Sequence, residues 1–572
     1  MAGSYWDKFM HQRLSRRRAL QGATAMSAAA GAIWLVGCGG DDDNGGNGTP
    51  GAGETPQGTQ EAGSPVRGGT YRVGSTADFD TFDPYIGIAA SVGYFPRLYN
   101  VLVNFSAQNT DFRFDDLSTG FEQPDDTTYV FTIRQGVKVG PNPLGIPERD
   151  LTAEDVQIAY ERIRTLPQSN AYAFIGQWMA ENTANPDGTY TFKTPRPYFF
   201  WRNRIGSPIN TIVPREALED AVIGRLRGEA AGAGPYLLES YAEGEGAVLV
   251  PNPNYYRTDE RTGEKLPYLG RFEVKIITER ATIRTAFQSD QLDSYGAENV
   301  DEVNQLSQGK NYAVVKEPSN TFIAFTMNPT REPWQDDRIR KAALYAINRQ
   351  EYIDRIYSGE AQANGLVHWS MGDAALSPDE LEELQPHDPA QSRQLIQAAT
   401  GQDTIRIKVM YPAESAIEQH NQVLPIWREQ MKAAGFELDE DPQPFPTWLD
   451  NYTKLEYDSS LALNQVYEYP EFNMDFQHSE GPARNNIYST GVGRLYPEID
   501  AEIDRVKSIT DAEEFYAAIK DLQRLIYEKG PTFIPFVTWN QFTLYHPRVK
   551  NIPTGLGASG LYVNDWWVDP NA

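Results

Sequence analysis

Hydrophobic residues follow two periodicities, which alternate along most of this chain. A period of two, typical of half-buried strands, predicts strands at residues 69–74, 128–133, 234–240, 272–277 and 322–328. A period near 3.6 predicts helices that begin near residues 151, 281, 336, 423 and 512. Strands that alternate with helices favour α/β lobes over an array of repeats.

Three of these helices have boundary signals in the sequence. Thr152, followed three residues later by Asp155, predicts a capping box at the start of one helix. A second helix is predicted to begin near Asp336 and to stop at Gly359. A third is predicted to end at Gly530, because glycine followed by proline cannot continue a helix.

The N-terminal segment is typical of a bacterial export signal. Arg16 and Arg17 precede an apolar run, as in a twin-arginine signal. The run ends at Leu-Val-Gly before Cys38, which resembles a lipobox, where a peptidase cuts before the cysteine and a lipid is attached to its sulfur. A transmembrane anchor over Ala19–Gly37 is the alternative, but small and weakly apolar residues dominate that stretch.

Composition narrows the class of partner. The chain has 572 residues, more than one hydrophobic core uses, so two or more lobes are expected. Its net charge of −27 argues against nucleic acid or an anionic membrane surface as a partner. Cys38 is the only cysteine, which excludes an intramolecular disulfide and a site built from several thiolates. Aromatic residues make up 12% of the chain, and this surplus suits a pocket that grips a ligand by stacking.

Catalytic and cofactor motifs are missing from the sequence. It contains no Gly-x-Ser-x-Gly or His-Glu-x-x-His motif and no Gly-Lys-Ser/Thr phosphate loop. The six histidines include no pair at zinc-binding spacing. The sequence therefore predicts no enzyme, no cofactor and no metal site, and leaves ATP to another protein.

Eight segments between residues 68 and 555 form an ordered series: Gly68–Val73, Leu98–Val103, Tyr129–Lys138, Leu151–Val156, Gly232–Leu238, Asn252–Tyr256, Phe325–Ile353 and Pro531–Phe536. Taken in this order, they resemble the family 5 solute-binding proteins of ABC importers, the dipeptide, oligopeptide and nickel-binding group.

The resemblance implies an α/β, two-lobed periplasmic-binding-protein-like fold with a hinge, discontinuous lobes and an additional inserted subdomain. It implies a signal peptide over residues 1–37 and a lipidated cysteine with a linker over residues 38–67. Lobe I is implied over residues 68–112, 230–318 and 541–572, the inserted subdomain over 113–229, and lobe II over 319–540. The hinge is expected near Phe322–Met327 and Thr538–Phe542.

The resemblance also implies how a short peptide is held. Val466–Glu471 resembles a family segment whose acidic residue pairs with the ligand's α-ammonium, so Glu468 is the candidate for that role. Arg484 is the candidate for the ligand's carboxylate. The candidates for aromatic contacts are Trp369, Trp448, Tyr467 and Trp539.

The predicted function is capture of a short peptide between two lobes and its delivery to an ABC permease and its ATPase. The protein is expected to be a monomer, tethered by the lipid on Cys38 to the outer face of the cell membrane, in the periplasm or cell-envelope space. An oligosaccharide receptor is the main alternative, because the chain is rich in tryptophan. A lipid-anchored hydrolase and a nickel-chelate binder are further alternatives.

Overall fold

A computed structural model gives the fold. It describes residues 63–87, 91–105, 112–113, 116–166, 169, 172–176, 178–198, 201, 205, 210–319, 321–413, 418–465, 470–481, 491–552 and 565–570. The predicted export signal and most of the predicted linker lie outside these residues. No helix among those described is long and apolar enough to cross a membrane.

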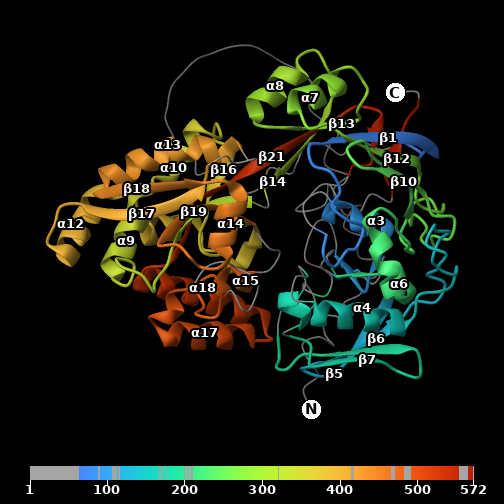
Figure 1. Cartoon of the computed structure of the whole chain (residues 1–572), viewed down its shortest axis with the longest axis horizontal. Helices are drawn as coiled ribbons and strands as arrows, with labels where there is room; N and C mark the ends of the chain where they lie inside the picture. Colours follow the sequence, from blue (N-terminus) through green and yellow to red (C-terminus); the bar gives the residue numbers. More distant parts are fainter. Residues whose placement is uncertain are drawn as a thin grey trace, which may run out of the picture. The chain divides into compact units, whose positions relative to one another are not determined.

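Two four-stranded sheets form on the N-terminal side of the chain. The first has the order β1-β12-β11-β10, with bounds Gly68–Ser75, Leu269–Ile276, Gly246–Pro251 and Tyr236–Ala242. The second has the order β5-β6-β8-β7, with bounds Ser118–Asp125, Thr128–Ile133, Thr189–Lys193 and Glu181–Ala184. Helix α4 (Ala153–Thr165) lies against the second sheet (Figure 1).

A third sheet has the order β13-β21-β14, with bounds Ser294–Ala297, Val537–Tyr545 and Ala313–Pro318. The start of β21 also pairs with β16 (Ala361–Ala363). Helices α7 (Arg280–Gln288) and α8 (Val300–Ser307) flank β13 in the sequence.

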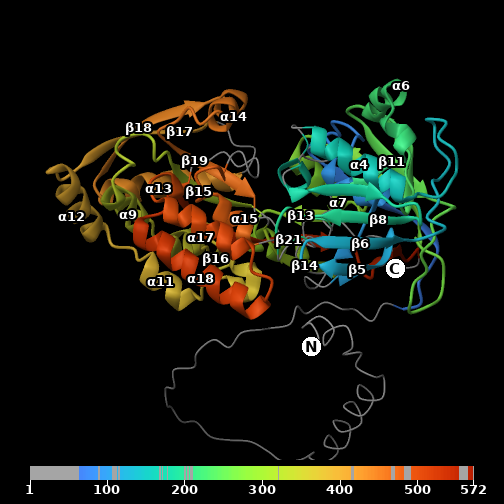
Figure 2. The ribbon, with the colours of Figure 1, turned by 90° about the horizontal axis from the view of Figure 1, so that it is seen from below.

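The fourth sheet is five-stranded and has the order β18-β17-β19-β15-β20. Its bounds are Phe436–Gln443, Ile405–Pro412, Ser459–Gln465, Thr321–Met327 and Phe533–Pro535. The helices of this part of the chain are α9 (Asp337–Ala346), α10 (Arg349–Arg355), α11 (Pro378–Leu384), α12 (Pro389–Thr400), α13 (Glu418–Ala433), α14 (Phe445–Thr453), α15 (Pro470–Asp475), α17 (Pro497–Lys507) and α18 (Ala512–Lys529). Helices α17 and α18 lie side by side in both views (Figure 2).

Shorter elements complete the described residues. These are the two-stranded pairs β2 (Asn100–Val101) with β9 (Thr211–Ile212), β3 (Asn104–Phe105) with β4 (Phe112–Arg113) and β22 (Val549–Lys550) with β23 (Trp567–Val568), and the short helices α3 (Phe95–Leu98) and α6 (Asp220–Ile223). The mixture of sheets and helices confirms the predicted α/β class.

The predicted helix boundaries are confirmed at two places. The Thr152 amide donates to the Asp155 carboxylate at 2.8 Å, and both halves of the capping box are present at the start of α4. Helix α18 ends at Lys529, and Gly530 follows with φ +75°, a conformation that glycine adopts without strain. Its apolar stripe is buried against the core, and each such side chain contributes about 2 kcal/mol.

The helix predicted from Asp336 to Gly359 is instead two helices. Helix α9 ends at Ala346, and α10 begins after Asn348. The Asn348 side chain accepts the Glu351 amide at 3.2 Å, so it caps the start of a new helix. The prediction was wrong because the apolar spacing continues across the break, while an asparagine cap leaves little trace in a periodicity.

Two short chain segments connect the third sheet to the five-stranded sheet, one from β14 to β15 and the other from β20 to β21. In the first, the Ser319 amide donates to the Trp539 carbonyl of β21 at 2.8 Å; in the second, the Phe536 amide donates to the Ile323 carbonyl of β15 at 2.9 Å. Both segments lie beside the stretches predicted as the hinge. The hinge and the domain boundaries stay predictions, since a single conformation does not show which residues bend.

Candidate functional site

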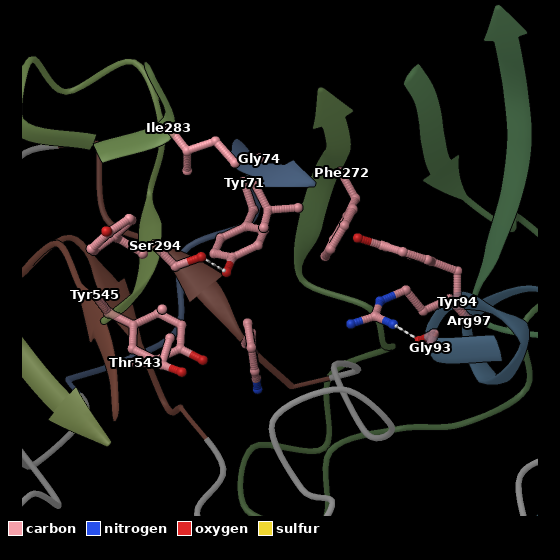
Figure 3. Close-up of a pocket in the computed structure, with 14 residues that line it drawn as sticks. Tyr71, Gly74, Gly93, Tyr94, Arg97, Phe272, Ile283, Ser294, Thr543 and Tyr545 are labelled. Atoms are coloured by element: carbon pink, nitrogen blue, oxygen red, sulfur yellow. Dashed lines mark hydrogen bonds between the residues drawn. The ribbon is translucent and has the colours of Figure 1, made fainter. Parts of the chain in front are cut away.

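A cavity of about 290 Å³ lies between the β1-β12 sheet and the β13-β21 pair. Figure 3 shows fourteen residues that line it. They come from β1, β12, β13, β21, the segment around α3, α7, and the segment before β23. All of them fall within the three ranges predicted to make lobe I.

Strand alternation brings one wall of the cavity together. Strands β1 and β12 are parallel, with Tyr71 opposite Phe272 in register. Because side chains of strand partners share a face, their rings meet at a centroid distance of 5.1 Å. Val73, two residues after Tyr71, lines the same cavity.

The opposite wall comes from an antiparallel pair. Ser294 of β13 is the register partner of Tyr545 of β21, and Gly296 is the partner of Thr543. The two walls are connected by a buried hydrogen bond of 2.6 Å between the Tyr71 hydroxyl and Ser294 Oγ (Figure 3). Burial raises the pKa of Tyr71 well above its ordinary value, so this hydroxyl stays protonated.

Arg97 is the only charged residue among those that line the cavity. It lies on α3 with 5% of its surface exposed. Its Nη1 donates to the Gly93 carbonyl, and its guanidinium carbon lies 4.8 Å from the Phe272 ring centroid and 5.1 Å from that of Tyr94. In Figure 3 the guanidinium points into the space in front of Tyr71 and Phe272.

The remaining donors of Arg97 have no protein acceptor. Nε is buried and makes no hydrogen bond, and Nη2 makes none with any residue that the structure describes. No described carboxylate forms an ion pair with Arg97. Burial lowers the pKa of the guanidinium.

Trp566 contributes a second donor without an acceptor. Its side chain is 1% exposed and lines the cavity, and its indole Nε1 has no hydrogen-bond partner among the described residues. The indole ring meets Tyr71 edge-on at 5.5 Å and Tyr545 at 5.9 Å. The site therefore combines a buried guanidinium, without a counter-ion among the described residues, with aromatic rings, and this arrangement suits a small anion.

Trp369, predicted to contact ligand, lies outside this cavity. It is half-buried at the start of the short helix Trp369–Ala374 and stacks on His368 at 5.2 Å. Its indole Nε1 is buried without a hydrogen-bond partner among the described residues. A half-buried indole with an unused donor suits ligand contact, and the role stays a prediction.

Trp448 and Trp539 lie in packed surroundings. Trp448 is 4% exposed, stacks on Tyr452 at 4.9 Å and donates to Ser460 Oγ at 3.2 Å. Trp539 is also 4% exposed and stacks on Tyr357 at 5.4 Å with an interplanar angle of 4°. Neither residue lines the cavity around Arg97, and their contact with a ligand stays a prediction.

The other predicted residues do not belong to the part of the chain that the structure describes. The ligand candidates Glu468, Tyr467 and Arg484, the lipidation candidate Cys38 and the export-signal arginines Arg16 and Arg17 all lie outside the described residues. Their roles stay predictions.

The sequence predicts no metal site, and the surroundings of two buried histidines are relevant to that prediction. His368 hydrogen-bonds Ser370 Oγ at 2.5 Å and Thr538 Oγ1 at 2.9 Å, so both ring nitrogens are engaged. Burial lowers its pKa to about 3, which keeps the ring neutral. His478 accepts the Glu480 amide at 2.9 Å. Among the described residues no group of three His, Cys, Asp or Glu side chains is placed to hold a metal ion.

Sequence reasoning did not single out Arg97 or Trp566. The pattern over Arg97 to Phe105 predicts only an apolar helix followed by a strand. An arginine at the head of such a run is a usable signal, because a charge inside an apolar segment needs a partner or a purpose. Trp566 carries no such signal, since its partners lie hundreds of residues away.

The fold and the cavity together define an α/β binding protein. A model of the bacterial extracellular solute-binding proteins, family 5 (Middle), matches residues 116–485. The chain belongs to this family, as the sequence resemblance predicted.

Two curated relatives show how far the similarity extends. The chain is 28% identical over 297 residues to the probable D,D-dipeptide-binding periplasmic protein DdpA of Escherichia coli (strain K12), covering 51% of this chain and 55% of the relative. It is 25% identical over 335 residues to the glutathione-binding protein GsiB of Salmonella typhi, covering 56% of this chain and 60% of the relative. These alignments span less than two thirds of either relative.

A solved structure supports the fold. The periplasmic binding protein DppA from Helicobacter pylori, determined in complex with the peptide STSA, superposes with a TM-score of 0.72. The superposition covers 88% of this chain and 99% of that one, at 17% sequence identity. At this identity the likeness establishes the periplasmic-binding-protein fold and nothing about the ligand.

Proposed function

We propose that this protein captures a short peptide outside the cytoplasm and delivers it to the permease of an ABC importer. The observation that carries the proposal is the family match over residues 116–485. The relatives named as dipeptide-binding and glutathione-binding agree with a ligand that has a peptide backbone. The mechanism is binding and release, with no chemical step.

Lobe closure is the mechanical part of the proposal. The β14-β15 and β20-β21 connections join the third sheet to the five-stranded sheet, and a hydrogen bond holds each connection to the strand that follows the other one. Two short connections are suited to hinge bending, because only a few dihedral angles need to change. A ligand that touches both lobes only in the closed form shifts the equilibrium toward closure.

The test is a thermal-shift screen with di- to hexapeptides and their N-acetylated counterparts. Free peptides are expected to raise the melting temperature and acetylated ones to do so less, because acetylation removes the α-ammonium proposed to pair with Glu468. Equal stabilisation by both would remove the Glu468 ion pair and leave peptide binding in place. Stabilisation by cello- or xylo-oligosaccharides alone would replace the peptide proposal with the sugar-receptor alternative. Turnover of ester, peptide or glycoside substrates would identify a hydrolase.

We also propose that a lipid on Cys38 tethers the receptor to the outer face of the membrane. A tether raises the local concentration of receptor at its permease. Cys38→Ser should release the protein from the membrane fraction. Changing Arg16 and Arg17 to Lys should trap precursor inside the cell, and normal export of that variant would argue for the ordinary secretion route.

A further inference from the structure

We propose that the cavity around Arg97 binds the carboxylate of the ligand, so that the receptor selects peptides with a free C-terminal acid. This inference rests on the proposed function for the identity of the ligand. It does not rest on it for the chemistry of the site, which belongs to residues that the structure describes.

The buried positive charge of Arg97 favours a negatively charged ligand. Arg97 is 95% buried, and no described carboxylate pairs with it, although the chain as a whole has a net charge of −27. No Asp or Glu is among the described residues that line the cavity. An arginine remains charged in a protein, and a buried charge without a counter-ion is costly. A ligand that brings a negative charge into the cavity removes that cost when it binds.

The guanidinium nitrogens of Arg97 differ in what they can reach. Nη1 donates to the Gly93 carbonyl, and Nε is covered by protein without a hydrogen-bond partner among the described residues. Nη2 has no acceptor among those residues either, which leaves it to donate a charge-assisted hydrogen bond to a carboxylate oxygen. Trp566 lines the same cavity with its ring, while its indole Nε1 is covered.

The guanidinium of Arg97 is also preorganised. The rings of Phe272 and Tyr94 lie against the guanidinium at 4.8 Å and 5.1 Å, and the Gly93 carbonyl fixes its other end. Its orientation is therefore set before a ligand arrives, which reduces the entropy lost on binding.

The size of the cavity limits what accompanies the carboxylate. A volume of about 290 Å³ is at the lower end for small-molecule sites, and the walls are mainly aromatic. The cavity therefore suits one terminal residue with an apolar side chain, with the rest of the peptide outside it.

The experiment compares an acid with its neutral counterpart. Binding of alanyl-phenylalanine and of its C-terminal amide is measured by calorimetry on the wild type and on Arg97→Met, Arg484→Met and Arg67→Met. The acid should bind the wild type on the order of 100-fold more tightly than the amide, because the amide cannot complete a charged pair. Arg97→Met should abolish that preference. Arg67→Met is the matched control, since Arg67 also lies over a tyrosine, at 5.2 Å from Tyr268, but does not line the cavity.

A second measurement needs no peptide. In protein labelled with ¹⁵N-arginine, the Nε–H resonance of Arg97 is identified by its loss in Arg97→Met and then followed on titration with phenylacetate and with inorganic phosphate. Phenylacetate should shift this resonance and phosphate should not, because the aromatic walls favour an organic acid. A phosphate response without a phenylacetate response would overturn the carboxylate assignment.

The outcomes separate the two proposals. If peptides bind but the acid preference persists in Arg97→Met, or is lost only in Arg484→Met, the cavity proposal is wrong and the peptide function stands. If no peptide binds but phenylacetate shifts the Arg97 resonance, the carboxylate site stands and the peptide function fails. If acid and amide bind the wild type equally and neither anion moves the resonance, the cavity is not a carboxylate site.

Discussion

Two buried arginines in this molecule occupy opposite situations. Arg97, beside the β1-β12 sheet, and Arg340, on α9 near the five-stranded sheet, are 5% and 0% exposed. Neither forms an ion pair with a described carboxylate. Arg340 nevertheless has an acceptor for each of its three nitrogens, whereas Arg97 has a protein acceptor for Nη1 alone.

The acceptors of Arg340 explain why its charge is tolerated. Nε donates to the Gly530 carbonyl at 2.7 Å and Nη2 to the Lys529 carbonyl at 2.7 Å, both at the C-terminal end of α18. Nη1 donates to the carbonyls of Trp334 and Gln335. The last carbonyls of a helix lack partners within the helix and carry partial negative charge, so a buried cation there satisfies both sides.

The comparison shows that burial alone does not distinguish structural from functional charges. A buried arginine whose donors are all engaged by backbone is part of the fold. A buried arginine that lines a cavity, and that has donors without an acceptor among the described residues, retains the capacity to bind something else.

Replacing Arg340 should have the largest effect on stability. Arg340→Met removes four hydrogen bonds to carbonyls and leaves the end of α18 unsatisfied. The free energy of unfolding should fall by about 3 kcal/mol. Urea denaturation monitored by circular dichroism measures it.

Arg338→Met is the control for this prediction. Arg338 lies on the same helix, but its side chain is 43% exposed and its carboxylate partner is Asp336. Exposed ion pairs contribute little, so this change should cost less than about 1 kcal/mol. If both variants lost the same free energy of unfolding, the hydrogen bonds from Arg340 to the carbonyls would contribute no more than an exposed ion pair.

His368 extends the comparison to a buried group that can lose its charge. Its contacts are Ser370, Thr538 and the ring of Trp369, none of which ionises near neutrality, and burial lowers its pKa to about 3. The unfolded chain, with an ordinary histidine pKa near 6.5, takes up the proton first as pH falls. Stability is therefore fully present above about pH 6.5 and is lost progressively down to about pH 3.

The expected loss from His368 is about 2 kcal/mol between pH 7 and pH 5, since each pH unit below about 6.5 costs about 1.4 kcal/mol. His368→Gln should reduce the acid slope, because an amide does not titrate. Comparing the pH dependence of unfolding in the two proteins isolates this residue. Identical slopes would mean that His368 is protonated in the folded state, which its engaged nitrogens argue against.

Sequence reasoning succeeded where the signal is local. The capping box at Thr152 and the stop at Gly530 depend on residues a few positions apart, and both are confirmed. The family resemblance also predicted the fold class. The break between α9 and α10 was missed, because the apolar spacing runs through it.

The cavity could not be predicted from the sequence, for a different reason. Its lining joins residues as far apart as Tyr71 and Trp566, and no spacing rule connects them. Arg97 and Arg340 both lie on helices, next to an apolar residue in the sequence. What separates them is which backbone carbonyls lie nearby, and tertiary structure alone supplies that information.

Replacing Arg97 should have the smallest effect on stability. Arg97→Met gives up one hydrogen bond, to Gly93, but also removes a buried charge that has no counter-ion among the described residues. Methionine keeps much of the contact with the Phe272 and Tyr94 rings. Its free energy of unfolding should stay within about 1 kcal/mol of the wild type or rise, since replacing poorly compensated buried charges by apolar groups is often neutral or stabilising. The same urea experiment measures it, without added ligand. A loss as large as that of Arg340→Met would make Arg97 a structural residue and would remove the physical basis for a carboxylate site.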